Sequence, residues 1–197
     1  MGENEQGGML RTVVVIGLVA IIAAAVTFGI LQLKKSMNDS ISSTSSRMRN
    51  LYLNSRGLTD GYNANGNATV TVEPFDSTTN MWHFVAAQGS GTNVGIYLWA
   101  NADGKIPNNS DWSYSADVKG TGKASYFGIE DSDKNPIRGT IGREWSRISQ
   151  TGHVGNPQRK TIIMYFDTSD SPLDVYIKLP KLETGNTATP WTAAPED

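Results

Sequence analysis

The stretch KTIIMYFDTSDSPLDVYIKLPKL, residues 160–182, indicates most clearly how this chain folds. In both of its halves apolar residues recur at every second position: Ile162, Met164 and Phe166, then Leu173, Val175, Ile177 and Leu179. Side chains of a β-strand point alternately to its two faces, so this spacing predicts two strands that each bury one face. The residues TSDSP between the halves favour a tight turn.

Six segments upstream have the same character: 68–73, 81–87, 94–100, 112–118, 123–129 and 145–150. Stretches rich in Gly, Asn, Asp and Ser separate them, as expected for turns. Eight short strands at this spacing predict an all-β domain over residues 51–197. We expect a β-sandwich, with the jelly roll as the commonest arrangement of such strands.

The N-terminal third is different. A polar leader, residues 1–11, precedes TVVVIGLVAIIAAAVTFGILQL, residues 12–33, which contains no charged residue. A helix of about 20 apolar residues spans the roughly 30 Å hydrocarbon core of a bilayer. We therefore expect one long hydrophobic, transmembrane-type helix that meets a membrane at some stage. Burial of this helix in an oligomeric or virion bundle is the main alternative, and proteolytic processing is a further one.

Residues 34–50 are polar and rich in serine, and they form a predicted stalk or linker. A loose heptad-like stripe favours a short oligomeric stalk, and the serines favour a flexible linker about equally: Ile30, Leu33, Met37, Ile41 and Met48. More basic residues follow the hydrophobic run than precede it, which by the positive-inside rule leaves the β-domain in the cytoplasm. Because that orientation conflicts with a role at the cell surface, the membrane topology stays open, and we expect either a virion or a membrane location.

The composition excludes several functions. The net charge is -2, and there is no cysteine and only two histidines, so no basic field indicates nucleic acid and no thiolate site exists. The sequence lacks GxSxG, P-loop and HExxH motifs, and no spacing pairs two carboxylates for glycoside hydrolysis. We therefore expect a protein that is not an enzyme and needs no cofactor.

The segment Asp131-Ser-Asp133-Lys-Asn135 resembles the first half of a calcium loop. However, Pro136 stands where such a loop needs glycine, and no glutamate stands at its twelfth position, so a solvated acidic turn is the better interpretation. Jelly-roll modules often hold a structural calcium ion, but this sequence assigns no ligands to one.

Strand alternation also separates the aromatic residues by face. In each strand the aliphatic residues define the core side, and five aromatic residues fall on the opposite side: Tyr97, Trp99, Tyr126, Tyr165 and Tyr176. Sugars stack their C–H faces on aromatic rings, so these residues are candidates for a carbohydrate-binding face. The alternative is that a neighbouring segment or subunit covers these rings. Trp112, Tyr114 and Trp145 are predicted core residues, whereas the pattern leaves Trp82 undecided between core and rim.

The two ends of the β-domain carry recognisable motifs. Its last residues include KLETG (181–185), Ala188, Thr189, Trp191, Thr192 and APED (194–197). Its first residues are NLYLNSRG (50–57), and EWSRISQTG (144–152) lies between them. This set resembles the C-terminal jelly-roll, carbohydrate-binding-module-like domain of tail and baseplate structural proteins from phages of Gram-positive bacteria. In that family Trp191 belongs to the terminal motif, and we expect it to pack the chain end onto the domain.

The resemblance implies a non-enzymatic structural protein of a phage or prophage virion that attaches to the host surface. Its implied partners are cell-surface polysaccharide and, through the N-terminal helix, other virion proteins or further copies of itself. The alternative is a membrane-anchored bacterial or prophage-encoded surface protein that displays the same module outside the virion. An accessory domain derived from a hydrolase is a third interpretation.

Overall fold

The computed structural model describes residues 25–41, 48–59, 61–194 and 197. The chain divides into two units, Met1–Ser46 and Arg47–Asp197. In the first unit the described residues, 25–41, are helical throughout. The second unit contains the strands, and each unit is considered separately below.

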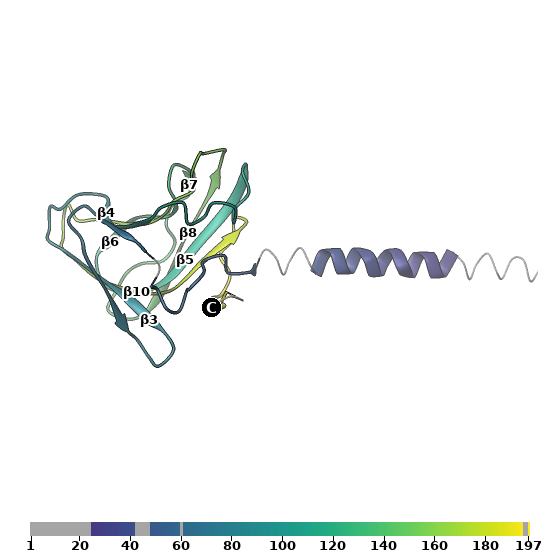
Figure 1. Ribbon diagram of the computed structural model, residues 1–197, viewed down its shortest axis with the longest axis horizontal. Helices are drawn as coiled ribbons and strands as arrows, with labels where there is room; N and C mark the ends of the chain where they lie inside the picture. Colours follow the sequence, from purple (N-terminus) through teal and green to yellow (C-terminus); the bar gives the residue numbers. More distant parts are fainter. Residues whose placement is uncertain (1–24, 42–47, 60, 195–196) are drawn as a thin grey trace, which may run out of the picture. The chain divides into compact units, whose positions relative to one another are not determined.

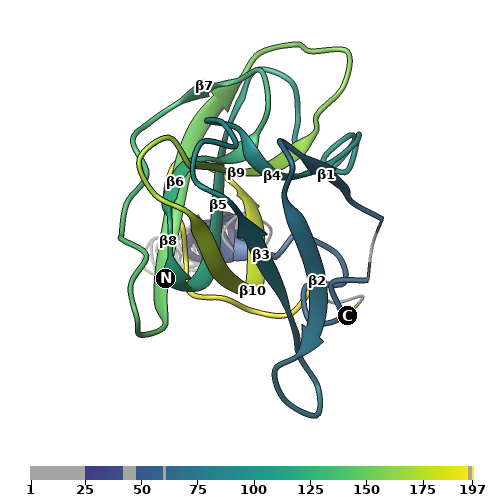
Figure 2. The same cartoon turned by 90° about the vertical axis from the view of Figure 1, so that its left-hand side faces the viewer.

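The described part of the second unit contains ten strands: β1 (Asn63–Asn65), β2 (Thr69–Pro74), β3 (Asn80–Ala86), β4 (Val94–Leu98), β5 (Ser110–Thr121), β6 (Lys123–Ile129), β7 (Asp133–Lys134), β8 (Ser146–Val154), β9 (Ile162–Asp167) and β10 (Leu173–Thr184). They form a four-stranded sheet, in the order β1-β4-β9-β6, and a six-stranded sheet, in the order β2-β3-β10-β5-β8-β7 (Figures 1 and 2). All eight strands predicted from the sequence are present. The two that were missed, β1 and β7, are only three and two residues long.

The two sheets enclose one core. Phe84 of the larger sheet packs against Phe166 of the smaller one, with ring centroids 5.4 Å apart, and Tyr114 faces Phe127 at 6.4 Å. Every strand pair is antiparallel. The predicted β-sandwich is therefore confirmed. From β3 onward the chain passes from one sheet to the other at each step, apart from the β7–β8 pair, which supports the finer prediction of a jelly roll.

The predicted core residues are mostly where alternation placed them. Trp112 and Tyr114 are fully buried, and so is Trp82, which the sequence left undecided. Trp145 was assigned to the core, and that prediction is wrong. Its ring is half-buried and packs edge-on against Phe75 at 5.7 Å, because it precedes β8 and is not one of that strand's inward-facing residues.

Strand β10 departs from simple alternation after Lys178. Leu173, Val175 and Ile177 are buried as predicted, but Leu179 is only half-buried and has a φ of 52°. The pairing with β5 shifts between Lys178 and Lys181, which marks a β-bulge. The extra residue reverses the phase of the strand, so the prediction that Leu179 shares the core face is wrong.

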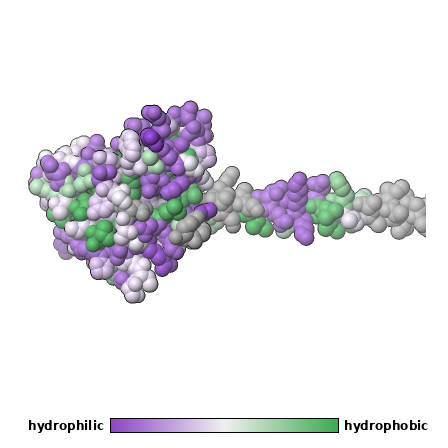
Figure 3. Space-filling model, in the orientation of Figure 1, coloured by the Kyte–Doolittle hydropathy of each residue, from purple (hydrophilic) through white to green (hydrophobic). Residues whose placement is uncertain are grey.

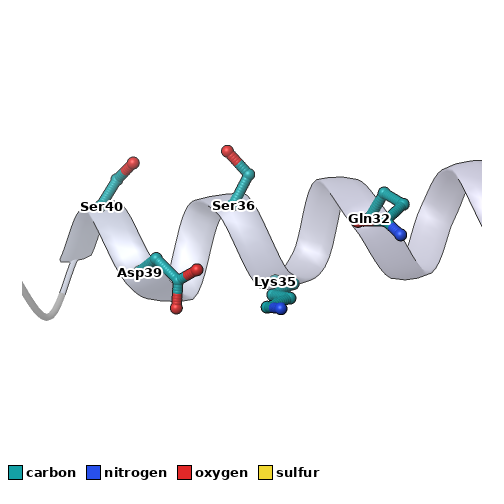
Figure 4. Close-up of a pocket in the computed structure, with 5 residues that line it drawn as sticks. All are labelled: Gln32, Lys35, Ser36, Asp39 and Ser40. Carbon is teal, nitrogen blue, oxygen red and sulfur yellow. The ribbon is translucent and has the colours of Figure 1, made fainter.

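The helical residues 25–41 present two kinds of surface. Four residues of the predicted stripe are more than half exposed: Ile30, Leu33, Met37 and Ile41. Polar side chains gather on another side of the same helix: Gln32, Lys35, Ser36, Asp39 and Ser40 (Figure 4). Figure 3 likewise shows hydrophobic and hydrophilic residues on the surface of this segment. The helix continues across residue 34, where the sequence placed the start of the stalk.

Within the residues that the structure describes, no helix is both long and apolar enough to cross a membrane. Residues 12–24 of the predicted hydrophobic helix lie outside the described residues.

The first and last segments of the β-unit are joined through Asn50. Its side-chain amide donates to the carbonyl oxygens of Pro180 and Thr192, both at 3.1 Å. Its side-chain oxygen accepts from the backbone N–H groups of Tyr52 and Leu182, at 3.0 and 3.2 Å. Asn50 is fully buried, and all four bonds reach backbone groups. This one side chain therefore provides hydrogen-bond partners for two carbonyl oxygens and two N–H groups that would be destabilising if left unpaired in the interior. The first and last segments of the β-unit therefore contact each other.

Two further contacts complete this junction. The backbone N–H of Ser55 donates to a carboxylate oxygen of Asp197 at 3.0 Å, and the Ser55 hydroxyl bonds to the same group. Arg56 lies over the ring of Trp191 at 5.3 Å. These contacts agree with the expected packing of the chain end onto the domain.

A buried ion pair lies beside the same junction. Lys181 Nζ is 3.1 Å from a carboxylate oxygen of Glu183, and both side chains are 1% exposed. Lys181 also donates to the Thr189 hydroxyl and the Pro190 carbonyl, at 2.7 and 2.8 Å. Glu183 accepts from the Thr189 backbone N–H at 2.9 Å. The charges are therefore paired and also hydrogen-bonded, which is the arrangement that makes burial of an ion pair tolerable.

Candidate functional site

The candidate site lies on the outer face of the four-stranded sheet. In β4 and β9 the alternate residues Ile96, Leu98, Ile162 and Met164 belong to the core, so Tyr97 and Tyr165 face outward. Strand β1 adds two polar residues on this face, Asn63 paired with Tyr97 and Asn65 paired with Gly95.

Gly95 separates two of these outward side chains. It pairs with Asn65 on one side and with Tyr165 on the other. A Cβ atom at position 95 would lie 2.0 Å from the Met164 carbonyl oxygen, so the close approach of β9 requires glycine here. The missing side chain leaves room between Asn65 and Tyr165.

The outer face contains a hollow of about 550 Å³ at this place. Six residues line it: Asn63, Asn65, Tyr97, Trp99, Glu130 and Tyr165. Trp99 is 63% exposed, whereas Tyr165 is only 6% exposed. The hollow therefore combines an open indole ring with a more deeply placed phenol and three polar side chains.

The turn that carries Trp99 is fixed to the sheet. Trp99 follows β4 directly, and Ala102 N–H donates to the Lys160 carbonyl oxygen at 3.0 Å. A carboxylate oxygen of Asp103 accepts from the Lys160 N–H at 2.5 Å. The indole is thus exposed on an anchored turn. Because this turn is already ordered, it loses little conformational entropy when a ligand binds.

The turn that carries Glu130 is anchored in the same way. The Glu130 N–H donates to the Thr161 carbonyl oxygen at 2.9 Å. Trp112 Nε1, in the core, donates to the Ser132 hydroxyl at 3.0 Å, and that hydroxyl donates to the Ile129 carbonyl oxygen at 2.6 Å. These bonds tie the backbone of the turn that carries Glu130 to the core.

Glu130 and Tyr165 form a coupled pair within the hollow. The Glu130 carboxylate and the Tyr165 hydroxyl are close enough for each to influence the protonation of the other. Burial, together with the nearby Glu130 charge, raises the pKa of Tyr165 to about 12. Burial and the neighbouring Asp131 carboxylate raise the pKa of Glu130 above its usual range. The phenol therefore stays protonated at neutral pH and acts as a donor.

Three of the five predicted binding residues meet in this hollow: Tyr97, Trp99 and Tyr165. Tyr126 pairs with Tyr165 in the sheet register, yet it is not among the residues that line the hollow. Its hydroxyl donates to the Ile129 carbonyl oxygen and contacts Ser132, and Lys134 Nζ covers its ring at 3.5 Å. Tyr126 therefore helps to fix the turn that carries Glu130.

Tyr176 is far from this group in the fold, because it belongs to β10 of the other sheet. There it stacks on His83, with ring centroids 4.1 Å apart and planes 11° apart. His83 in turn contacts Asp174 at 2.8 Å and Glu73 at 3.2 Å. The structure does not bring Tyr176 together with the other four residues.

Three residues that line the hollow, Asn63, Asn65 and Glu130, were not predicted from the sequence. The two asparagines precede the first predicted strand, but their spacing of two residues places them on one face of β1. Glu130 follows the core residues Phe127 and Ile129 in the same phase as Tyr126. Extending the alternation one residue beyond β6 would have included it.

No metal centre is visible in the described part of the chain, where no group of three or more His, Asp or Glu side chains could hold an ion. Asp133 and Lys134, from the segment that resembles half a calcium loop, form the short strand β7 paired with β8.

No protein-family model matches this sequence, and no curated protein matches it. Among solved structures, the CBM22-1 xylan-binding domain of Paenibacillus barcinonensis Xyn10C is similar, with a TM-score of 0.48 and 15% identity over 71% of this chain and 94% of that domain. The CBM22-1–CBM22-2 tandem of the same protein gives 0.48 and 15% over 69% of this chain and 45% of the tandem. An arabinose-bound α-L-arabinofuranosidase, MgGH51, gives 0.43 and 13%, over 69% of this chain and 25% of that protein. These likenesses are weak, and the β-sandwich is assigned from the strand pairing of this chain itself.

Proposed function

We propose that the β-unit is a non-enzymatic jelly-roll module that binds carbohydrate through the hollow on the four-stranded sheet. The observation that supports this most is the exposed Trp99 ring beside Tyr97, Asn63 and Glu130 in one hollow. An open indole offers a flat apolar surface for the C–H face of a sugar. The amides, the carboxylate and the Tyr165 hydroxyl offer acceptors and donors for sugar hydroxyl groups.

In this proposal the whole chain is a virion-associated structural protein of a phage or prophage, and the module attaches the particle to polysaccharide on the host surface. The sequence motifs at the two ends of the β-unit support this context. The alternative is a membrane-anchored bacterial or prophage-encoded surface protein that displays the same module.

Replacing Trp99 with alanine is expected to weaken glycan binding by at least about 30-fold, which corresponds to about 2 kcal/mol for the loss of a central aromatic contact. Because the ring is 63% exposed, the melting temperature should hardly change. The measurement is affinity electrophoresis of the full chain in gels that contain polysaccharide from Gram-positive cell walls, or soluble xylan, β-glucan or galactomannan.

Tyr176→Ala is the matched control, since it removes a surface aromatic residue from the other sheet. If the hollow is the binding site, Tyr176→Ala should bind the glycan with the same affinity as the unchanged chain. Equal losses for Trp99→Ala and Tyr176→Ala would show that the hollow is not the binding site. A large fall in melting temperature for Trp99→Ala would instead make the ring a structural residue.

The virion location makes a separate prediction. After phage induction, quantitative mass spectrometry should find the chain enriched in purified particles at a fixed ratio to other virion proteins. Recovery from cell membranes, with particles that lack the chain, would favour the membrane-anchored alternative.

A further inference from the structure

The charge of the hollow is one-sided. Of the six residues that line it, Glu130 is the one carboxylic acid, and none is lysine, arginine or histidine. The Tyr165 phenol, whose pKa is raised to about 12, is neutral and adds no positive charge. The lining of the hollow therefore contains an acidic group and no basic one.

Charged groups outside the lining act in both directions, since Lys134 Nζ lies over the Tyr126 ring at 3.5 Å, whereas Asp131 adds a further carboxylate. Asp131 follows Glu130 in the same turn, and its negative charge contributes to raising the pKa of Glu130. Arg159 does not line the hollow, and its guanidinium lies 3.5 Å from the Asp103 carboxylate. An incoming anion would thus meet Glu130 without a basic side chain in the lining to neutralise either charge.

We propose that the hollow selects uncharged stretches of glycan and rejects stretches that carry carboxylate or phosphate groups. This inference rests on the proposed glycan-binding function and specifies its substrate class. On a Gram-positive surface it favours neutral polysaccharide over polyol-phosphate polymers or uronic acid chains.

The expected size of the effect follows from Coulomb's law. Repulsion between two like charges about 5 Å apart at a partly solvated site should weaken binding by roughly tenfold. This effect lies between the one expected in bulk water and the larger one expected at a protein surface. Salt shortens the range of this repulsion to about 8 Å at physiological ionic strength and to about 3 Å at 1 M. The preference should therefore weaken as salt is added.

The test compares two derivatives of one polymer. The polysaccharide that the full chain retains best is converted to a hydroxyethyl form, which is neutral, and to a carboxymethyl form, which has side groups of similar size with a charge. The unchanged chain should bind the hydroxyethyl form about tenfold more tightly. In Glu130→Gln this ratio of affinities should fall toward one, whatever happens to the absolute affinities.

Glu144→Gln is the control, because it removes the same charge from an exposed loop residue that does not line the hollow. It should keep the tenfold ratio. In the unchanged chain, raising the salt to about 1 M should reduce the ratio, which provides a test that needs no substitution.

Equal affinity for the two derivatives, or a ratio that Glu130→Gln leaves unchanged, would overturn the inference. If the unchanged chain retains no polysaccharide of the panel at all, the glycan-binding function itself fails, and the inference fails with it.

Discussion

Asn50→Ala is expected to lower the free energy of unfolding by about 3–5 kcal/mol, since each buried polar group left without a partner costs roughly 1–3 kcal/mol. The substitution removes four hydrogen bonds to backbone groups, and the residue is fully buried. Two N–H groups and two carbonyl oxygens would then lose a partner at the junction of the first and last segments. Denaturation with urea, followed by tryptophan fluorescence, measures the change.

Asn186→Ala is the control for this prediction. Asn186 is exposed, and the corresponding change should stay within about 0.5 kcal/mol. A loss below about 1 kcal/mol for Asn50→Ala would mean that water replaces the side chain, and that the contact between the two end motifs contributes little to stability.

Lys181→Met is expected to destabilise the domain by a similar amount, about 3–5 kcal/mol, because it leaves the Glu183 carboxylate buried without its counter-charge. Lys181 is 1% exposed, so water does not reach the carboxylate easily to compensate. Glu183→Gln should be destabilising too, since Lys181 then lacks its anion. Chemical denaturation of both variants and of the double variant gives the coupling energy between the two residues.

A second ion pair in the same domain provides the comparison. Lys123 and Asp167 approach within 2.8 Å, closer than the buried pair, but the Lys123 side chain is 65% exposed. Lys123→Met should leave the free energy of unfolding almost unchanged, as is usual for surface pairs. If the two lysine substitutions have equal effects, burial does not determine the strength of these pairs.

The fold could be predicted well from the sequence because burial of one strand face imposes a period of two. That regularity located all eight longer strands and most of the core. It failed at Leu179, where a residue with positive φ inserts an extra position into β10 and reverses the phase. It also failed at Trp145, since a residue that precedes its strand need not follow that strand's alternation.

The candidate site could be predicted only in part. Alternation tells which face of its own strand a residue occupies, but it does not tell to which sheet that strand belongs. A sandwich has two outer faces, so Tyr97 and Tyr176 satisfied the same criterion and lie on different sheets. Trp99, two positions after Tyr97 and in the turn that follows β4, lines the same hollow as Tyr97. Long-range pairing, which places Asn63 and Glu130 beside them, was not visible in the local pattern.

The junction made by Asn50 and Asp197 has a consequence for protein engineering. Because the backbone enters and leaves the β-unit at neighbouring points, the unit can be grafted into an exposed loop of an unrelated host whose two loop ends are close together. The two ends of the recipient loop could stay at their original separation, and the recipient's core would not need to change.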